Sequence, residues 1–169
     1  MARANTELVH ALRKTADRLD EGLHYEWGNP AACNCGHLAR TVTELSQAEL
    51  LGYAKERQAE WGEIVIDSCP TSGMPIDWVI DRLVQLGLTH DDLAKLEDLD
   101  HAEVLQRLPL DQRRKLRRNR REDVVLYLRT WADLLAERIT PEVALADALT
   151  GSQLAGRERA LDGASPSRV

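Results

Sequence analysis

The amino-acid sequence predicts an all-α fold, and three observations lead to this prediction. The apolar residues are mostly Leu, Ala, Val and Ile, with four Trp, three Tyr and no Phe, a composition that favours helices over strands. Apolar side chains recur at helical spacing in several segments. The strand-like run at residues 64–66 is solitary, and a single strand cannot form a sheet. We therefore predict a single-domain bundle of about six helices.

Four segments with helical periodicity are predicted to build the core: 6–20, 37–45, 76–86 and 121–139. In each of them, apolar residues at intervals of three and four form one face that must be buried. Asn5 or Thr6 can cap the first segment, because a short polar side chain accepts hydrogen bonds from the free amides of a first turn. These helices should therefore pack against one another through their apolar faces.

Capping pairs mark three shorter helices. A Ser, Thr or Asp followed three residues later by a carboxylate is typical of a helix start. Such pairs are Ser46 with Glu49, Thr89 with Asp92, and Asp100 with Glu103. Pro109 is predicted to end the third of these helices, because proline cannot continue a helix.

The domain organisation follows from length and composition. A chain of 169 residues is long enough to bury one core. Beyond residue 150 the sequence is rich in Gly, Ser and Ala and poor in large apolar groups. We therefore predict one helical domain over residues 1–150 and a flexible tail over residues 151–169.

Charge and hydropathy exclude some classes of protein. The formal net charge of −6 argues against a surface that binds nucleic acids in general, because affinity for phosphates comes from clustered cations. No apolar run approaches the ~20 residues of a membrane-spanning helix, and no signal-peptide segment is present. We expect a cytoplasmic protein without membrane contact. The abundance of Arg, Ala and Leu is typical of bacteria with GC-rich genomes.

Three cysteines and one histidine form the chemically unusual feature of the chain. Cys33, Cys35 and His37 lie in one short segment, and Cys69 lies in a second irregular segment. Three thiols and one imidazole are the number and type of ligands in a closed tetrahedral zinc site. The same set fits an iron–sulfur cluster, but zinc is favoured because it needs no assembly machinery. The sequence therefore predicts a metal-binding protein with a structural, sensory or accessory role.

The spacing of the first two cysteines is unusual for zinc, because only Asn34 separates them. If the backbone is extended there, Cys33 and Cys35 point to the same side and can chelate one ion. Gly36 permits a tight turn before a helix that begins near His37. The positive end of that helix is expected to lower the thiol pKa values and favour the thiolates that a metal requires.

Other interpretations of these residues stay open. The cysteines can be small buried apolar groups, or Cys33 and Cys35 can form a strained, reducible disulfide in a thiol-redox protein. Upstream, His24 and Glu26 can support a metal ligand, but the favoured interpretation leaves them facing water. No phosphate-binding glycine motif or zinc-protease helix indicates an enzyme class.

The segment 113–121 is strongly basic and contains seven of the 22 Lys and Arg residues, which leaves 15 basic against 28 acidic residues elsewhere. Such a segment can bind nucleic-acid phosphates or an acidic protein partner. The favoured interpretation is that its arginines pair with carboxylates of the same chain. No aromatic residue interrupts the basic run, which argues against stacking on single-stranded bases.

Overall fold

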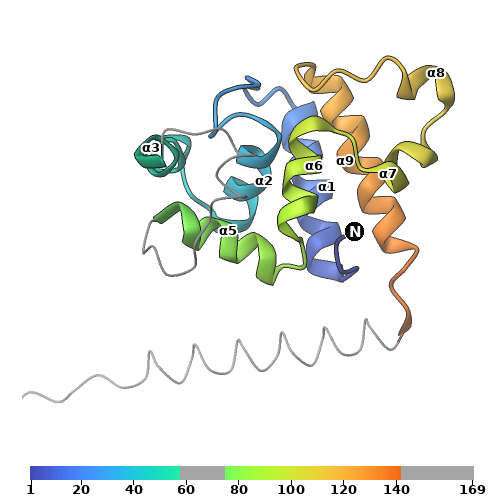
Figure 1. The fold of residues 1–169 in the computed structure, drawn as a ribbon, viewed down its shortest axis with the longest axis horizontal. Coiled ribbons are helices and arrows are strands. Elements are labelled where there is room, and N and C mark those ends of the chain that lie inside the picture. Colours follow the sequence, from blue (N-terminus) through green and yellow to red (C-terminus); the bar gives the residue numbers. More distant parts are fainter. Residues whose placement is uncertain (58–74, 142–169) are drawn as a thin grey trace, which may run out of the picture.

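The computed structural model describes residues 1–57 and 75–141, which form eight helices and no strand (Figure 1). The all-α prediction is confirmed for this part of the chain. These eight helices are more than the total of about six that was predicted, and the helix without a predicted counterpart is the four-residue turn at Leu110–Arg113. The strand-like run at 64–66, Cys69 and the tail at 151–169 lie outside the described residues.

The helices are α1 (Thr6–Asp20), α2 (Asn34–Thr43), α3 (Gln47–Arg57), α5 (Pro75–Gln85), α6 (His90–Asp98), α7 (Ala102–Arg107), α8 (Leu110–Arg113) and α9 (Arg121–Ala136). The four predicted core segments correspond to α1, α2, α5 and α9. The start of the second was predicted near His37, whereas α2 begins at Asn34. None of the helices within the described ranges combines the length and apolarity needed to cross a bilayer.

Two of the three predicted capping pairs are confirmed. Ser46 and Glu49 exchange hydrogen bonds at the start of α3, and Thr89 and Asp92 form a complete capping box at the start of α6. The third pair is wrong, because the residue that precedes α7 is His101 and its side chain makes no capping bond. Instead, the backbone amide of His101 donates to the buried Tyr127 hydroxyl at 3.0 Å. A side chain from α9 therefore holds the start of α7.

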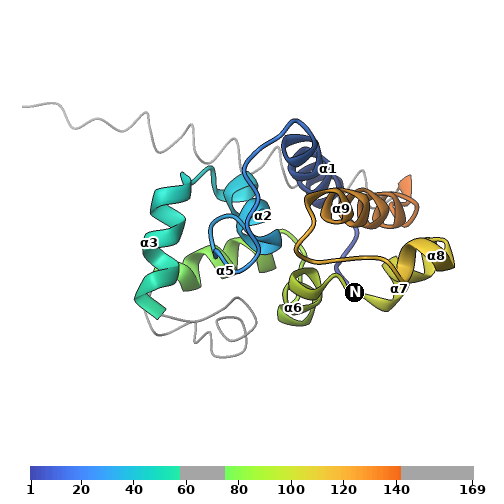
Figure 2. The ribbon, with the colours of Figure 1, turned by 90° about the horizontal axis from the view of Figure 1, so that it is seen from above.

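The helices α1 and α9 lie side by side along most of their length (Figures 1 and 2). Both bury an apolar face, and the largest fully buried side chain, Trp131, belongs to α9. Exposed ion pairs connect the two helices at their edges. Arg13 pairs with Asp133 at 2.9 Å, and Arg129 pairs with Asp17 and Asp20 at 2.9 Å. Exposed pairs contribute about 0–1 kcal/mol each, so apolar burial holds the two helices together.

The short helix α2 is the centre of the fold. It contacts α1, α3, α5 and α6, and Figure 2 shows it enclosed between neighbours rather than lying on the surface. Residues 31–39 are all buried, without the exposed polar face that a surface helix presents. The buried Thr41 hydroxyl contacts that of Thr15 in α1 at 2.9 Å. The segment with the cysteines is therefore the most enclosed part of the described chain.

The loop that leads into α2 passes so close to the helix that only glycine fits at position 36. A Cβ atom on Gly36 would overlap the carbonyl oxygen of Pro30 and lie 2.9 Å from the carbonyl carbon of Ala31. Both obstacles are backbone atoms, which cannot move aside by changing a rotamer. Gly36 therefore permits close packing of the loop on the helix, and not the turn that was predicted from sequence.

We predict that Gly36→Ala destabilises the protein, because the added methyl group must displace the loop backbone. Overpacking of this kind costs about 1–3 kcal/mol. The matched control is Gly52→Ala in α3, where a Cβ meets open space and the substitution should stabilise the helix by about 0.5–1 kcal/mol. Urea unfolding followed by circular dichroism measures both. A Gly36→Ala variant as stable as the parent chain would contradict this packing.

Candidate functional site

The predicted ligand residues occupy one end of the central helix. Cys33 is the residue that precedes α2, and Cys35 and His37 lie inside its first turns. The Asn29 carbonyl oxygen accepts the backbone amide of Cys33 at 2.9 Å, and the Cys33 carbonyl accepts that of His37 at 3.0 Å. The expectation that the cysteines lie in a loop is thus corrected for Cys35, which is helical, whereas His37 lies in a helix as the predicted segment 37–45 has it. Cys69 lies outside the described residues.

The helical backbone directs Cys35 and His37 to different neighbours. In an α-helix, a residue and the second residue after it are related by a rotation of about 200°. Their side chains therefore point to different sides of the helix. Cys35 Sγ lies 3.2 Å from the carbonyl oxygen of Leu93 in α6. His37 Nε2 lies 3.0 Å from the carbonyl oxygen of His24, in the loop before α2. The extended backbone under which Cys33 and Cys35 would share a side is present at Cys33 alone, because Asn34 and Cys35 are helical.

The Glu97 carboxylate is a member of this site that sequence reasoning missed. Glu97 lies in α6 and is only 9% exposed. The negative charge of its carboxylate acts on both Cys33 and Cys35, which places Glu97 near the two thiols at the start of α2. A signal was present, because Glu97 follows Leu93 by four residues and so falls on the apolar face of its helix.

The two thiols are held in their neutral form. Burial raises the pKa of the Cys33 and Cys35 thiols well above the ordinary value, and the negative charge of Glu97 raises it further. The backbone amides of Gly36 and Cys35 lower the pKa of Cys33, as expected at a helix N-terminus, but their effect is the smaller one. The predicted net lowering is therefore wrong for the folded chain without a bound ion, because burial outweighs the helix dipole.

Polar contacts fix the geometry around the thiols. The buried Asn34 amide donates to the carbonyl oxygens of Leu96 at 3.0 Å and Glu97 at 2.8 Å, which ties α2 to the last turn of α6. The Tyr25 hydroxyl lies 2.7 Å from Asn34 Oδ1 and also contacts the carbonyl oxygen of Arg118. Asn34 therefore anchors the cysteine pair to α6 and connects it, through Tyr25, to the basic segment.

His37 is occupied in holding the loop before α2. It is 2% exposed, and its ring stacks on Tyr25 with centroids 6.2 Å apart. Burial and the positive charge of Arg40 lower the pKa of His37 to about 4. A neutral imidazole that donates to the His24 carbonyl is the state that this environment favours. Metal binding by Nε2 would require that hydrogen bond to break.

The favoured interpretation of His24 and Glu26 agrees with the structure. Both side chains are exposed and lie 3.5 Å from each other on the outer side of the loop. Tyr25, between them in sequence, is partly buried and packs against the core. His24 and Glu26 therefore face water while the aromatic residue anchors the loop.

The described residues do not by themselves form a closed set of metal ligands. Within residues 1–57 and 75–141, no three His, Cys, Asp or Glu side chains are grouped closely enough to hold an ion. The charge of Glu97 acts on Cys33 and Cys35, but these three side chains would have to move closer together, and a closed site also needs a ligand from elsewhere in the chain. The sequence prediction supplies one in Cys69.

We predict that the stability of the protein falls with acidification partly through His37. Because its pKa is about 4 in the folded chain and 6.5 ordinarily, the unfolded chain takes up a proton first as the pH falls. The free energy of unfolding contributed by His37 is therefore complete above pH 6.5 and is lost towards pH 4, with a slope of up to about 1.4 kcal/mol per pH unit.

Urea unfolding of His37→Gln across this pH range, in the presence of a chelator, measures that slope. The exposed His10 in α1 provides the matched control, His10→Gln. The His37→Gln variant should show the shallower dependence on pH, because Gln cannot be protonated. Equal slopes for the two variants would show that His37 is not the neutral, buried imidazole described above.

Comparison of the chain with protein families, with curated proteins and with solved structures gives no match. The residues of this chain are therefore the basis for its candidate function.

Proposed function

We propose that the chain binds one thiophilic divalent metal ion, zinc in preference to an iron–sulfur cluster, through Cys33 and Cys35. The third ligand is Cys69, as the sequence predicts, and Glu97 is the fourth. The observation that carries the proposal is the burial of two thiols at the start of the central helix, where the negative charge of the buried Glu97 acts on both. The role is structural, sensory or accessory.

The chemistry of these groups suits zinc. Thiolate sulfur and carboxylate oxygen both bind Zn²⁺, and four such ligands complete its tetrahedral shell. The amides at the start of α2 favour negative charge on the Cys33 sulfur, so the helix supports the thiolate once an ion replaces the proton. Binding must release thiol protons, which makes the affinity dependent on pH.

Glu97 is a better fourth ligand than His37, which the sequence prediction named. The Glu97 carboxylate is close enough for its charge to act on both thiols. His37 Nε2 instead contacts the His24 carbonyl oxygen. Recruiting His37 would cost that hydrogen bond and loosen the loop, whereas recruiting Glu97 keeps the described contacts of α2 and α6.

The other two interpretations of the cysteines account for less. Buried, neutral thiols are poor nucleophiles, which disfavours thiol-redox chemistry in this conformation. A purely apolar role for the cysteines gives no reason for a carboxylate that is 9% exposed and whose charge acts on both of them. Burial of a carboxylate is costly, and a metal ion between the three groups offsets that cost.

We predict that the full chain, purified without a histidine tag and freed of metal, binds one equivalent of Zn²⁺ with release of protons. Cys33→Ser, Cys35→Ser and Cys69→Ser should each weaken binding by more than about 100-fold, because hydroxyl groups do not replace thiolates as zinc ligands. Glu97→Gln should weaken it about 10-fold to 100-fold. Isothermal titration calorimetry in two buffers of different ionisation enthalpy measures affinity and proton release together.

The matched control for Glu97→Gln is Glu49→Gln in α3, where the carboxylate is exposed and caps its own helix. It should bind zinc like the parent chain. Binding that survives both Cys33→Ser and Cys35→Ser would contradict the proposal. If His37→Gln greatly weakened zinc binding and Glu97→Gln did not, the ligand set predicted from sequence would be the correct one.

A further inference from the structure

The basic segment 113–121 crosses one end of the molecule between α8 and α9 and is not the continuous helix that its sequence permits (Figure 1). Residues 114–120 are exposed, apart from the half-buried Leu116. Three of its cations pair with carboxylates: Arg118 with Asp98, Arg120 with Asp123, and Arg121 with Glu122. The interpretation in which its arginines pair within the chain is therefore correct for part of the segment.

The remaining cations of the exposed loop project into solvent. Among the described residues, the side chains of Arg114, Lys115 and Arg117 have no hydrogen-bond or ion-pair partner. They lie close together in sequence on a protein whose net charge is −6. Unpaired cations of this kind attract phosphate groups and release counterions when they bind them.

A hollow lies on each side of this loop. One has a volume of about 580 Å³ and lies between Trp27, the end of α6 and residues 116–119. The other has a volume of about 480 Å³ and is lined by His24, Tyr25 and residues 119–122, among others. Asn119 lines both hollows. We call the surface made of the two hollows and the basic loop between them the basic groove.

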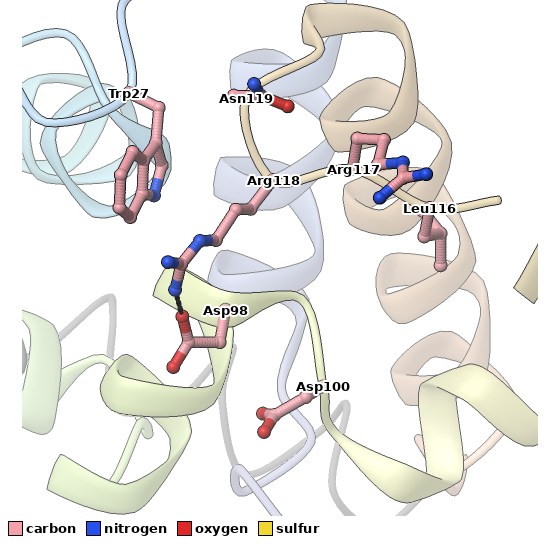
Figure 3. Close-up of a pocket in the computed structure, with 7 residues that line it drawn as sticks. All are labelled: Trp27, Asp98, Asp100, Leu116, Arg117, Arg118 and Asn119. Atoms are coloured by element: carbon pink, nitrogen blue, oxygen red, sulfur yellow. Dashed lines mark hydrogen bonds and ion pairs between the residues drawn. The ribbon is translucent and has the colours of Figure 1, made fainter. Parts of the chain in front are cut away.

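Aromatic side chains reach the basic groove from a distant part of the sequence. Trp27 lies against Arg118, whose guanidinium carbon is 4.0 Å from the centre of the indole ring. In Figure 3, Arg118 extends past Trp27 to Asp98, whereas Arg117 points away from that pair. The sequence argument against base stacking considered only neighbours in the basic run. The fold supplies the missing aromatic groups, Tyr25 and Trp27, from the loop before α2.

We propose that the basic groove binds single-stranded nucleic acid. Cationic side chains beside aromatic rings form the usual surface for single strands, since phosphates bind the cations and bases stack on the rings. Arg117, which lines the larger hollow, and its neighbours in sequence Arg114 and Lys115 bind the phosphates. Trp27 stacks with a base, which takes the place of the Arg118 guanidinium, and Arg118 turns to the strand. This proposal does not depend on the metal site.

The carboxylates in the groove favour this ligand over an acidic polypeptide. Asp98 and Asp100 line the larger hollow, where they would repel the carboxylates of an acidic peptide. Bases are neutral and carry amino groups that donate hydrogen bonds to carboxylates. A double helix is disfavoured, because the segment presents an irregular loop and no helix that would enter a major groove.

The test is the fluorescence anisotropy of labelled single-stranded RNA and DNA, about 16 nucleotides long, titrated with the full chain at about 50 and 200 mM salt. Three phosphate contacts on a single strand predict a slope of about −2 when the logarithm of the binding constant is plotted against the logarithm of the salt concentration. The affinity should therefore fall about 15-fold between the two salt concentrations. The triple variant Arg114→Ala, Lys115→Ala and Arg117→Ala should weaken binding more than tenfold and flatten the slope. Trp27→Leu should weaken it about tenfold.

Two controls match these variants. The first is a triple variant that removes the same charge from α1, α3 and α5: Lys14→Ala, Lys55→Ala and Arg82→Ala. The second is Trp78→Leu, which removes an exposed indole from α5. Both should bind like the parent chain.

Four results would overturn the proposal. The first is no binding of the single strand at the lower salt concentration, and the second is an equal loss of affinity in the variants and their controls. The third is tighter binding of a duplex of the same sequence. The fourth is displacement of the labelled strand by poly-glutamate as effectively as by unlabelled strand. The last result would assign the groove to an acidic polypeptide.

Discussion

The burial of α2 on all sides is the constraint on which the rest of the structure depends. A short helix with residues 31–39 enclosed can form only if α1, α5 and α6 pack around it. Its polar groups must then find partners inside the protein, because a buried group without one costs free energy. Asn34 meets this requirement by donating to two carbonyl oxygens at the end of α6. The position of Glu97 beside the thiols follows from that attachment.

This enclosure also decides how the cysteines behave. A thiol at a helix N-terminus that faces water would have a lowered pKa, whereas Cys33 and Cys35 have raised ones because they are buried beside Glu97. The proton on each sulfur is thus the partner that a metal ion replaces. In this account, the metal joins α2 and α6 to the segment that carries Cys69, and a small core gains a crosslink between distant parts of its sequence.

Local patterns predicted the elements whose signals lie within a few residues. The cap at Asn5 and the apolar spacing of residues 6–20 are sufficient to define α1, and Thr89 with Asp92 define the start of α6. The start of α2 was misplaced because Gly36 was expected to form a turn before the helix. Gly36 lies within α2 instead and permits close packing of the loop on it. The start of α7 was missed because Tyr127, far away in sequence, holds it.

The difference between local signals and contacts that are distant in sequence also applies to the candidate site. The sequence identified Cys33 and Cys35 by residue type, which needs no structure. It could not show that Glu97 faces them, or that Trp27 lies against Arg118, since both contacts join segments more than sixty residues apart. Glu97 was detectable only as a carboxylate on the apolar face of a predicted helix. A charged residue in such a position is a reason to look for a partner across the core.

X-ray absorption at the zinc edge, recorded on the one-to-one complex of the full chain, tests the central claim most directly. The account predicts a first shell with three sulfur atoms at about 2.3 Å and one lighter atom at about 2.0–2.2 Å. Loss of two sulfur atoms from that shell should follow in the Cys33→Ser and Cys35→Ser double variant. A shell made only of nitrogen and oxygen atoms would contradict the account, because it would place the ion away from the buried cysteines.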